Sequence, residues 1–287
     1  MSLLRTFLHL SRVSYLPTVW SNCLAGMWLG GAGDWRTIPY LLAASTFLFL
    51  SGSFFKEACG APFDSQHRRW RPIAAGHISA RAVFGWGVYW LIMGVAGLFW
   101  LKPVAGFLGL ALGVCMLGYA VAHRALIFSP ILLGLCRFGL YLIGASVAFQ
   151  GTTGWAVWGG LAVAVYTAGV KCFSPIAPRV VPARWPILLL AAPVLLAFAM
   201  NGGEYREAAL LLSLVLCLWI IRSLRHSWWS EQPDVVLTSS GLVAGTVLVD
   251  WLAVAAAPKE VSVAFIVLFV SALGLQRVRP VVAKSPA

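Results

Sequence analysis

The stretch VAGFLGLALGVCMLGYAVA, residues 104–122, decides the fold class, because no charged side chain interrupts it. A helix of about 20 apolar residues spans the hydrocarbon core of a bilayer. Continuous apolar runs are typical of membrane helices, whereas the strands of a membrane β-barrel alternate apolar and polar residues. The stretch therefore predicts a transmembrane helix.

Similar apolar stretches occur along the whole chain of 287 residues, which is 60% hydrophobic and 10% charged, with a mean hydropathy of +0.86. Soluble domains carry about 25% charged residues, so a soluble domain is excluded. We expect an all-α polytopic bundle of nine to ten transmembrane helices, forming one integral-membrane domain over residues 1–287. The expected spans are 14–32, 38–58, 82–101, 104–122, 127–149, 154–173, 185–201, 205–222, 236–257 and 261–276.

The 21 Lys and Arg residues exceed the 9 Asp and Glu residues and give a net charge of +12. In a membrane protein this excess gathers in cytoplasmic loops, so it does not indicate nucleic-acid binding. If the N-terminus is cytoplasmic, 15 basic residues fall in or beside cytoplasmic segments and four fall in the opposite loops. This bias predicts that both termini are cytoplasmic.

Charged side chains inside membrane spans are costly and indicate a function or a paired structural role. Lys56, Glu57, Arg137 and Asp250 are the charges within the predicted spans. Glu57 and Asp64 are two helical turns apart, so they would share a face if the helix continued past a proline between them. The basic segment HRRWRPIAAGHIS follows at residues 67–79.

Three segments carry a resemblance to a known family. The stretch RPIAAGHIS, residues 71–79, resembles the RPxxSGxIS element of the UbiA superfamily of intramembrane prenyltransferases. RVSYLPTVWSNCLAG, residues 12–26, resembles the first helix of a bacterial subgroup, and LLGLCRFGLYLIGA, residues 132–145, resembles its fifth helix. The resemblance covers nearly the whole chain and implies a location in the bacterial inner membrane.

The resemblance implies transfer of a prenyl group from an isoprenyl diphosphate to an aromatic, quinone, pigment-type or other lipophilic acceptor. In this family two Mg²⁺ ions, held by two Asp-rich motifs, neutralise the diphosphate that leaves. Lysine and arginine side chains add to this stabilisation, and a dry aromatic cavity shelters the allylic cation.

The chain departs from the family at both metal motifs. The first motif, NDxxDxxxD, falls on KEACGAPFD at residues 56–64, where only Glu57 and Asp64 remain as carboxylates. The second falls on YTAGVKCFSPIAPR at residues 166–179, which contains no carboxylate and places Lys171 there. Glu57 and Asp64 would therefore hold at most one Mg²⁺.

Two functions follow from these departures. If the protein is an active transferase, the resemblance implies that Lys56, Glu57 and Asp64 are catalytic, with Glu57 and Asp64 holding the metal ion. The diphosphate would then bind three basic side chains, those of Arg68, Arg71 and Lys171. If it is inactive, Lys56 and Glu57 form only a neutralising pair. The protein is then a structural or lipid- or pigment-binding subunit of a membrane complex with partner proteins.

Other polar residues within the spans leave alternatives open. Asn22 matches a polar position of the family and either faces the cavity or bonds between helices. Arg137 either lines the diphosphate pocket or pairs with an acid such as Asp250 or Glu57. A transporter is a third functional class, supported only by the intramembrane charges.

Overall fold

The computed structural model describes residue 7 and the ranges 10–67, 71–122, 128–173, 185–200, 206–229 and 234–277. These residues form ten α-helices and two short 3₁₀-helices, with no strand among them, so the predicted all-α fold is confirmed. The 3₁₀-helices are η1 (Val13–Tyr15) and η2 (Trp35–Thr37). The α-helices are α2 (Leu16–Leu29), α3 (Ile38–His67), α4 (Ala80–Leu101), α5 (Pro103–Ala122), α6 (Phe128–Val147), α7 (Gly154–Cys172), α8 (Ile187–Met200), α9 (Arg206–Trp228), α10 (Val235–Ala253) and α11 (Lys259–Arg277).

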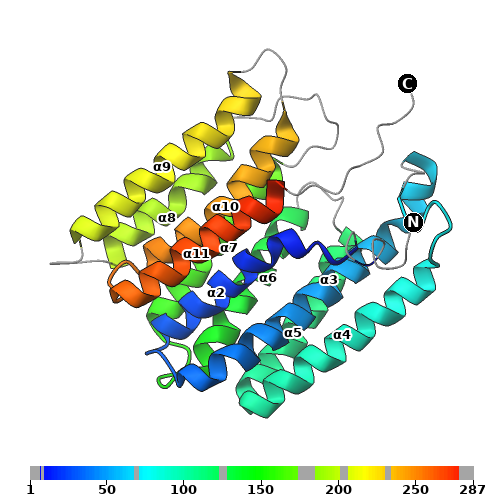
Figure 1. Ribbon diagram of the computed structural model, residues 1–287, viewed down its shortest axis with the longest axis horizontal. Helices are drawn as coiled ribbons and strands as arrows, with labels where there is room; N and C mark the ends of the chain where they lie inside the picture. The colour runs from blue at the N-terminus through cyan, green and yellow to red at the C-terminus, as the bar shows by residue number, and fades with distance from the viewer. Residues whose placement is uncertain are drawn as a thin grey trace.

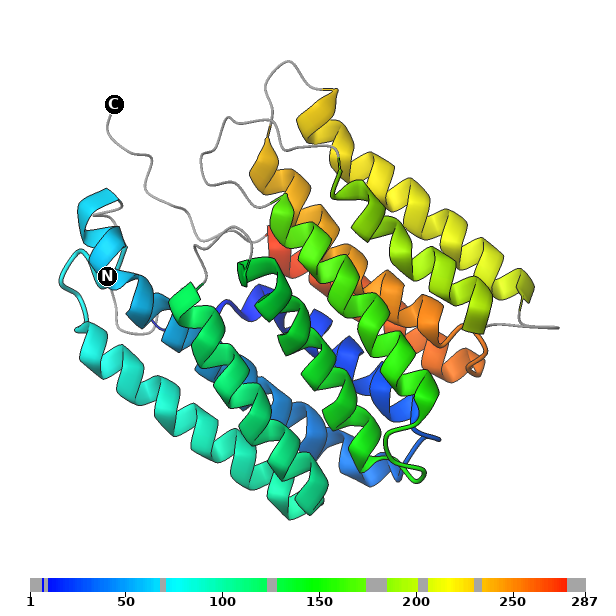
Figure 2. The same ribbon diagram turned by 180° about the vertical axis from the view of Figure 1, so that it is seen from behind.

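The helices lie side by side along one common direction, which Figures 1 and 2 show from opposite sides. Helices α3, α4 and α5 pack together at one flank, and α8, α9 and α10 pack together at the other. Helix α2 lies between them and contacts α3, α6, α7, α10 and α11. The successive helices run in alternate directions, and η1 contacts α11, so the chain enters and leaves the described bundle at the same end.

Seven of the described helices are long and apolar enough to cross a bilayer. Many large apolar side chains on the outside of the bundle are exposed, including Trp100, Val114 and Leu188. Apolar side chains face outward in this way when lipid replaces water as the solvent. The chain is therefore an integral membrane protein.

Each of the ten predicted spans has a matching helix, although α9 continues to Trp228 beyond the predicted 222 and α10 ends at Ala253 before the predicted 257. The largest difference is in α3. Helix α3 does not end near residue 58 but continues to His67, with Pro62 inside it. Proline cannot donate the backbone hydrogen bond of an interior helical position. The helix continues for five residues past this proline, so Asp64 stays in helical register with Glu57.

Helices α2 and α6 approach each other most closely at two glycines. A Cβ atom at Gly26 would meet the backbone carbonyl of Tyr141, and one at Gly144 would meet the backbone carbonyl of Cys23. Small residues allow membrane helices to pack backbone against backbone. The two glycines therefore fix the crossing of α2 and α6 at the centre of the bundle.

We expect Gly144→Val to destabilise the protein, because the new side chain would overlap the backbone of α2. Overpacking costs about 1–3 kcal/mol, which corresponds to a fall of roughly 2–12 °C in the midpoint of thermal unfolding for a protein of this size. The midpoint is measured in detergent by size-exclusion chromatography after heating. Gly85→Val is the matched control, since a Cβ there meets nothing within 4 Å. An unchanged midpoint for Gly144→Val would contradict the crossing.

Candidate functional site

The end of α3 carries the two carboxylates that the sequence places near each other. Glu57 and Asp64 are both buried, at 5% and 4% exposure. Because α3 continues through Pro62, the two residues lie on one face of the helix, two turns apart. The expectation that they share a face is therefore met.

Two arginines bind these carboxylates. One guanidinium nitrogen of Arg12 lies 2.5 Å from Oε1 of Glu57, and one of Arg71 lies 2.8 Å from Oε2 of the same residue. The same nitrogen of Arg71 lies 3.1 Å from Oδ2 of Asp64. Charge-assisted hydrogen bonds of this kind are the strong ones, and a buried carboxylate needs them. Glu57 thus ties two segments that are distant in sequence to the end of α3.

Local backbone conformation places both arginines. Arg12 adopts a left-handed conformation, with φ 47° and ψ 43°, directly before η1. After Arg71, the RPIAAGHIS segment turns back by backbone hydrogen bonds, including one of 2.7 Å from Ala75 N to Arg71 O. Gly76, at φ 77°, supplies the positive dihedral angle of this turn, and Ser79 caps the first turn of α4.

A cavity of about 210 Å³ lies inside the bundle next to this cluster. Its lining comes from η1 and the residue before it and from helices α2, α3, α5, α6, α7 and α10. Four basic side chains face it, Arg12, Lys56, Arg137 and Lys171, and no carboxylate is among its described lining residues. The rest of the wall is largely apolar and aromatic, with Phe49 and Tyr119 among its members.

Lys56 lies in the cavity wall and not in the carboxylate cluster. Its ammonium lies over the ring of Tyr119, 5.4 Å from the ring centre. The ion pairs of Glu57 within the described residues go to Arg12 and Arg71, so the structure does not show the expected Lys56–Glu57 pair. Adjacent residues of a helix point about 100° apart, which directs Lys56 into the cavity while Glu57 faces the arginines.

A buried polar network lies behind Arg137, which is its one member among the described residues that line the cavity. Arg137 donates to Oδ1 of Asn22 at 2.8 Å and to Oγ1 of Thr18 at 2.9 Å. Asn22 in turn donates to the carboxylate of Asp250 at 2.8 Å, and Ser21 donates to that carboxylate at 2.5 Å. Asn22 therefore bridges Arg137 and Asp250, and Arg137 lines the cavity as well. Among the described residues, Arg137 thus reaches Asp250 through Asn22 and not by a direct ion pair. Asn22 bonds between helices and is not among the described lining residues of the cavity.

The carboxylates do not fit a magnesium site in this arrangement. Both oxygens of Glu57 already accept from arginines, and Oδ2 of Asp64 accepts from Arg71. A divalent cation between the two carboxylates would have to take the place of the Arg71 guanidinium. The described residues also contain no group of three or more His, Cys, Asp or Glu side chains arranged to hold a metal ion.

The structure thus brings most of the predicted site residues to one region. Lys56, Arg137 and Lys171 line the cavity, and Glu57, Asp64 and Arg71 form the adjacent cluster. Arg68, which the sequence also assigns to the site, lies outside the described residues. Sequence reasoning missed Arg12 and Tyr119, although Arg12 begins the quoted RVSYLPTVWSNCLAG segment.

Solved structures with the same fold include two that are described as UbiA homologues. The apo structure of a UbiA homologue from Aeropyrum pernix K1 matches with a TM-score of 0.68 and 17% identity, over 83% of this chain and 96% of that chain. A structure described as digeranylgeranylglyceryl phosphate synthase matches with a TM-score of 0.58 and 14% identity, over 96% and 100%. A UbiA homologue from Archaeoglobus fulgidus, bound to DMAPP and Mg²⁺, matches with a TM-score of 0.52 and 11% identity, over 96% and 100%.

No curated protein sequence matches the chain. At these identities the solved structures establish a shared fold. The sequence itself matches the model of the UbiA prenyltransferase family over residues 14–177, which is more than half of the chain and includes the carboxylate cluster and Lys171. The chain therefore belongs to the UbiA prenyltransferase family.

Proposed function

We propose that the protein binds an isoprenyl diphosphate in the 210 Å³ cavity and transfers the prenyl group to a lipophilic acceptor in the membrane. Fixed cations take over the role that metal ions have elsewhere in the family. One observation carries this proposal, namely that the described lining of the cavity includes four basic side chains and no carboxylate. A cavity that combines cations with an apolar wall suits an anionic headgroup with a hydrocarbon tail.

The charge balance around the cavity supports an anionic ligand. The positive charges of Arg12 and Arg71 are offset by Glu57 and Asp64. Lys56 shares the cavity wall with three further basic side chains, those of Arg12, Arg137 and Lys171. Mutual repulsion of buried cations is costly in a region of low dielectric constant. A bound diphosphate would relieve it, and Lys56 and Lys171 would then be its main partners.

In the proposed reaction, the protein stabilises the negative charge of the leaving diphosphate and keeps water away from the allylic cation. The bond between the allylic carbon and the bridging oxygen breaks, and its electron pair leaves with the diphosphate. The acceptor forms a new bond to that carbon and releases a proton. Lys56 and Lys171 would stabilise the negative charge on the leaving group. The aromatic rings of Phe49 and Tyr119 would shelter the allylic cation from water.

Glu57 would not contact the diphosphate in this proposal, and its role would be to hold the side chains of Arg12 and Arg71 in position. Glu57 holds Arg12 at the cavity wall and Arg71 above Asp64. Within this proposal, a Mg²⁺ ion could bind to Glu57 and Asp64 only if the Arg71 side chain moved away from them. The proposal includes one domain over residues 1–287, placed in a bacterial inner membrane with both termini in the cytoplasm.

A second candidate function has an observation of its own. The carboxylates that remain from the metal motif are neutralised by arginines, as in a structural ion-pair cluster. In this alternative the cavity holds a lipid, a quinone or a pigment without reaction, and the protein is a subunit of a membrane complex. Both candidates use the same cavity, so binding and product formation must be measured separately.

Binding of geranylgeranyl diphosphate to the purified protein, measured by calorimetry with Mg²⁺ and then with EDTA, tests the cation-based site. We expect saturable binding that persists in EDTA, because lysines hold the diphosphate. Lys56→Met should weaken it at least about tenfold, the effect of losing roughly 1.4 kcal/mol. Lys259→Met, at an exposed position at the opposite end of the bundle, is the matched control. Binding that disappears in EDTA would restore the magnesium assignment to Glu57 and Asp64.

The reaction itself is tested in a strain that lacks the gene. We expect one prenylated lipid to be missing from its membrane extract and to return with the wild-type gene but not with Lys56→Met, since the leaving group then loses a cation. The variant protein must be present in the membrane at the wild-type level. Identical lipid extracts from the deletion and parent strains would instead favour the non-catalytic subunit, and gentle purification would then identify its partners.

A further inference from the structure

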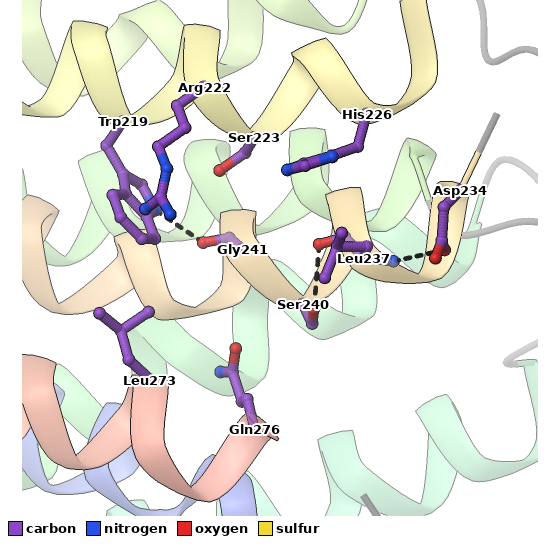
Figure 3. Close-up of a pocket in the computed structure, with 10 residues that line it drawn as sticks. All are labelled: Trp219, Arg222, Ser223, His226, Asp234, Leu237, Ser240, Gly241, Leu273 and Gln276. Carbon is purple, nitrogen blue, oxygen red and sulfur yellow. Dashed lines mark hydrogen bonds between the residues drawn. The ribbon is translucent and has the colours of Figure 1, made fainter. Parts of the chain in front are cut away.

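A second pocket, with a volume of about 400 Å³, opens between α9, α10 and α11 (Figure 3). It lies at the end of the bundle where α9 and α11 finish and α10 begins, the same end as the carboxylate cluster. Its described lining shares no residue with the cavity of the proposed reaction. The proposed function therefore leaves this pocket unused.

The pocket is lined by several hydrogen-bond donors. The guanidinium of Arg222 packs over the ring of Trp219, 4.9 Å from its centre, and makes no ion pair within the described residues. Trp219 is itself held by a 2.8 Å hydrogen bond to the carbonyl of Gly241. The His226 ring lies one turn after Arg222 on the same wall (Figure 3). One face of the pocket is therefore cationic.

The opposite wall carries an amide nitrogen without a partner. Nε2 of Gln276, on α11, is buried and makes no hydrogen bond within the part of the chain that the structure describes. Figure 3 shows the Gln276 side chain directed from α11 toward α10, facing the pocket. A buried unsatisfied N–H donor costs about 1–3 kcal/mol, so an acceptor that fills the pocket would stabilise the structure.

A single carboxylate is among the described lining residues, that of Asp234, and it has a structural use. It accepts a 2.8 Å hydrogen bond from the backbone N–H of Leu237 and caps the first turn of α10. This bond and the positive end of the helix offset its charge. Arg222, His226 and Gln276 are then available to an anion with several acceptor oxygens, as in a phosphate group.

The surface below the pocket is apolar. Leu211, Leu214 and Leu218 are 65%, 57% and 57% exposed along the preceding turns of α9. Arg222 follows Leu218 by one turn, so the change from lipid-facing to polar surface occurs at the pocket. A ligand with a phosphate group in the pocket and hydrocarbon chains along α9 would match both surfaces.

We propose that this pocket binds the phosphate headgroup of an anionic phospholipid from the surrounding leaflet. The phosphate oxygens accept from Arg222 and from the Gln276 amide, and the acyl chains lie against the exposed leucines of α9. The lipid thereby joins α9, α10 and α11 at one end of the bundle. This inference does not rest on the proposed prenyl transfer, because it uses a different pocket and different residues.

Native mass spectrometry of the whole protein, exchanged from detergent into mixtures with dioleoylphosphatidylglycerol or dioleoylphosphatidylcholine, tests this proposal. We expect one phosphatidylglycerol molecule to be retained and phosphatidylcholine to be lost, since a net anionic headgroup suits the uncompensated Arg222. Arg222→Gln and Gln276→Glu should each weaken retention roughly tenfold. Gln276→Glu keeps the side-chain size and replaces a donor with an anion, and an unchanged midpoint of thermal unfolding in detergent checks that the variants are folded.

Arg206→Gln is the matched control, because Arg206 is an exposed arginine at the opposite end of the same helix. It should leave retention unchanged. Equal retention by the wild type and both pocket variants would overturn the proposal, as would equal retention of the two lipids. Competition by soluble glycerol 3-phosphate as effective as that by the lipid would show a site for small phosphate esters and would overturn the assignment to a phospholipid.

Discussion

A charged side chain that is buried in the membrane interior requires a partner within the protein. In this protein the partners come from α2 and from the residues directly before it. Arg12 binds Glu57 of α3. Asn22 lies within α2 and bridges Arg137 of α6 and Asp250 of α10. Three helices that are far apart in sequence are thereby tied to one short helix. The cavity lies among the same helices, so its shape depends on these polar contacts.

The side chains that line this site are positively charged, whereas the metal-based sites that the family resemblance implies are lined with negatively charged carboxylates. Where carboxylates would gather metal ions around a diphosphate, the described residues place lysines in the wall and use the remaining carboxylates to hold arginines. A fixed cation supplies charge without a bound ion, although it cannot share several phosphate oxygens as a metal ion does. In the function proposed above, the fold keeps its cavity while fixed side chains replace metal ions as the source of positive charge.

The sequence predicted the fold well, because span length and hydropathy depend only on local composition. The continuation of α3 through Pro62 was not predictable, since the cost of a proline depends on what stabilises the following turns. The direction of Lys56 away from Glu57 was available from helical geometry alone. The rarity of charges in the spans suggested Asp250 as an acid near Arg137. No pattern in one sequence reveals that Asn22 bridges these two residues, or that Arg12 binds Glu57, which lies 45 positions away.

The glycine crossing of α2 and α6 has a consequence for how ligands enter the cavity. Gly26 and Gly144 leave no space between the two backbones, so a side chain or a ligand cannot lie between α2 and α6 at this crossing. A ligand that enters the cavity from the side must therefore pass beside this pair, at α3, α5, α7 or α10, which also line the cavity, and not between α2 and α6.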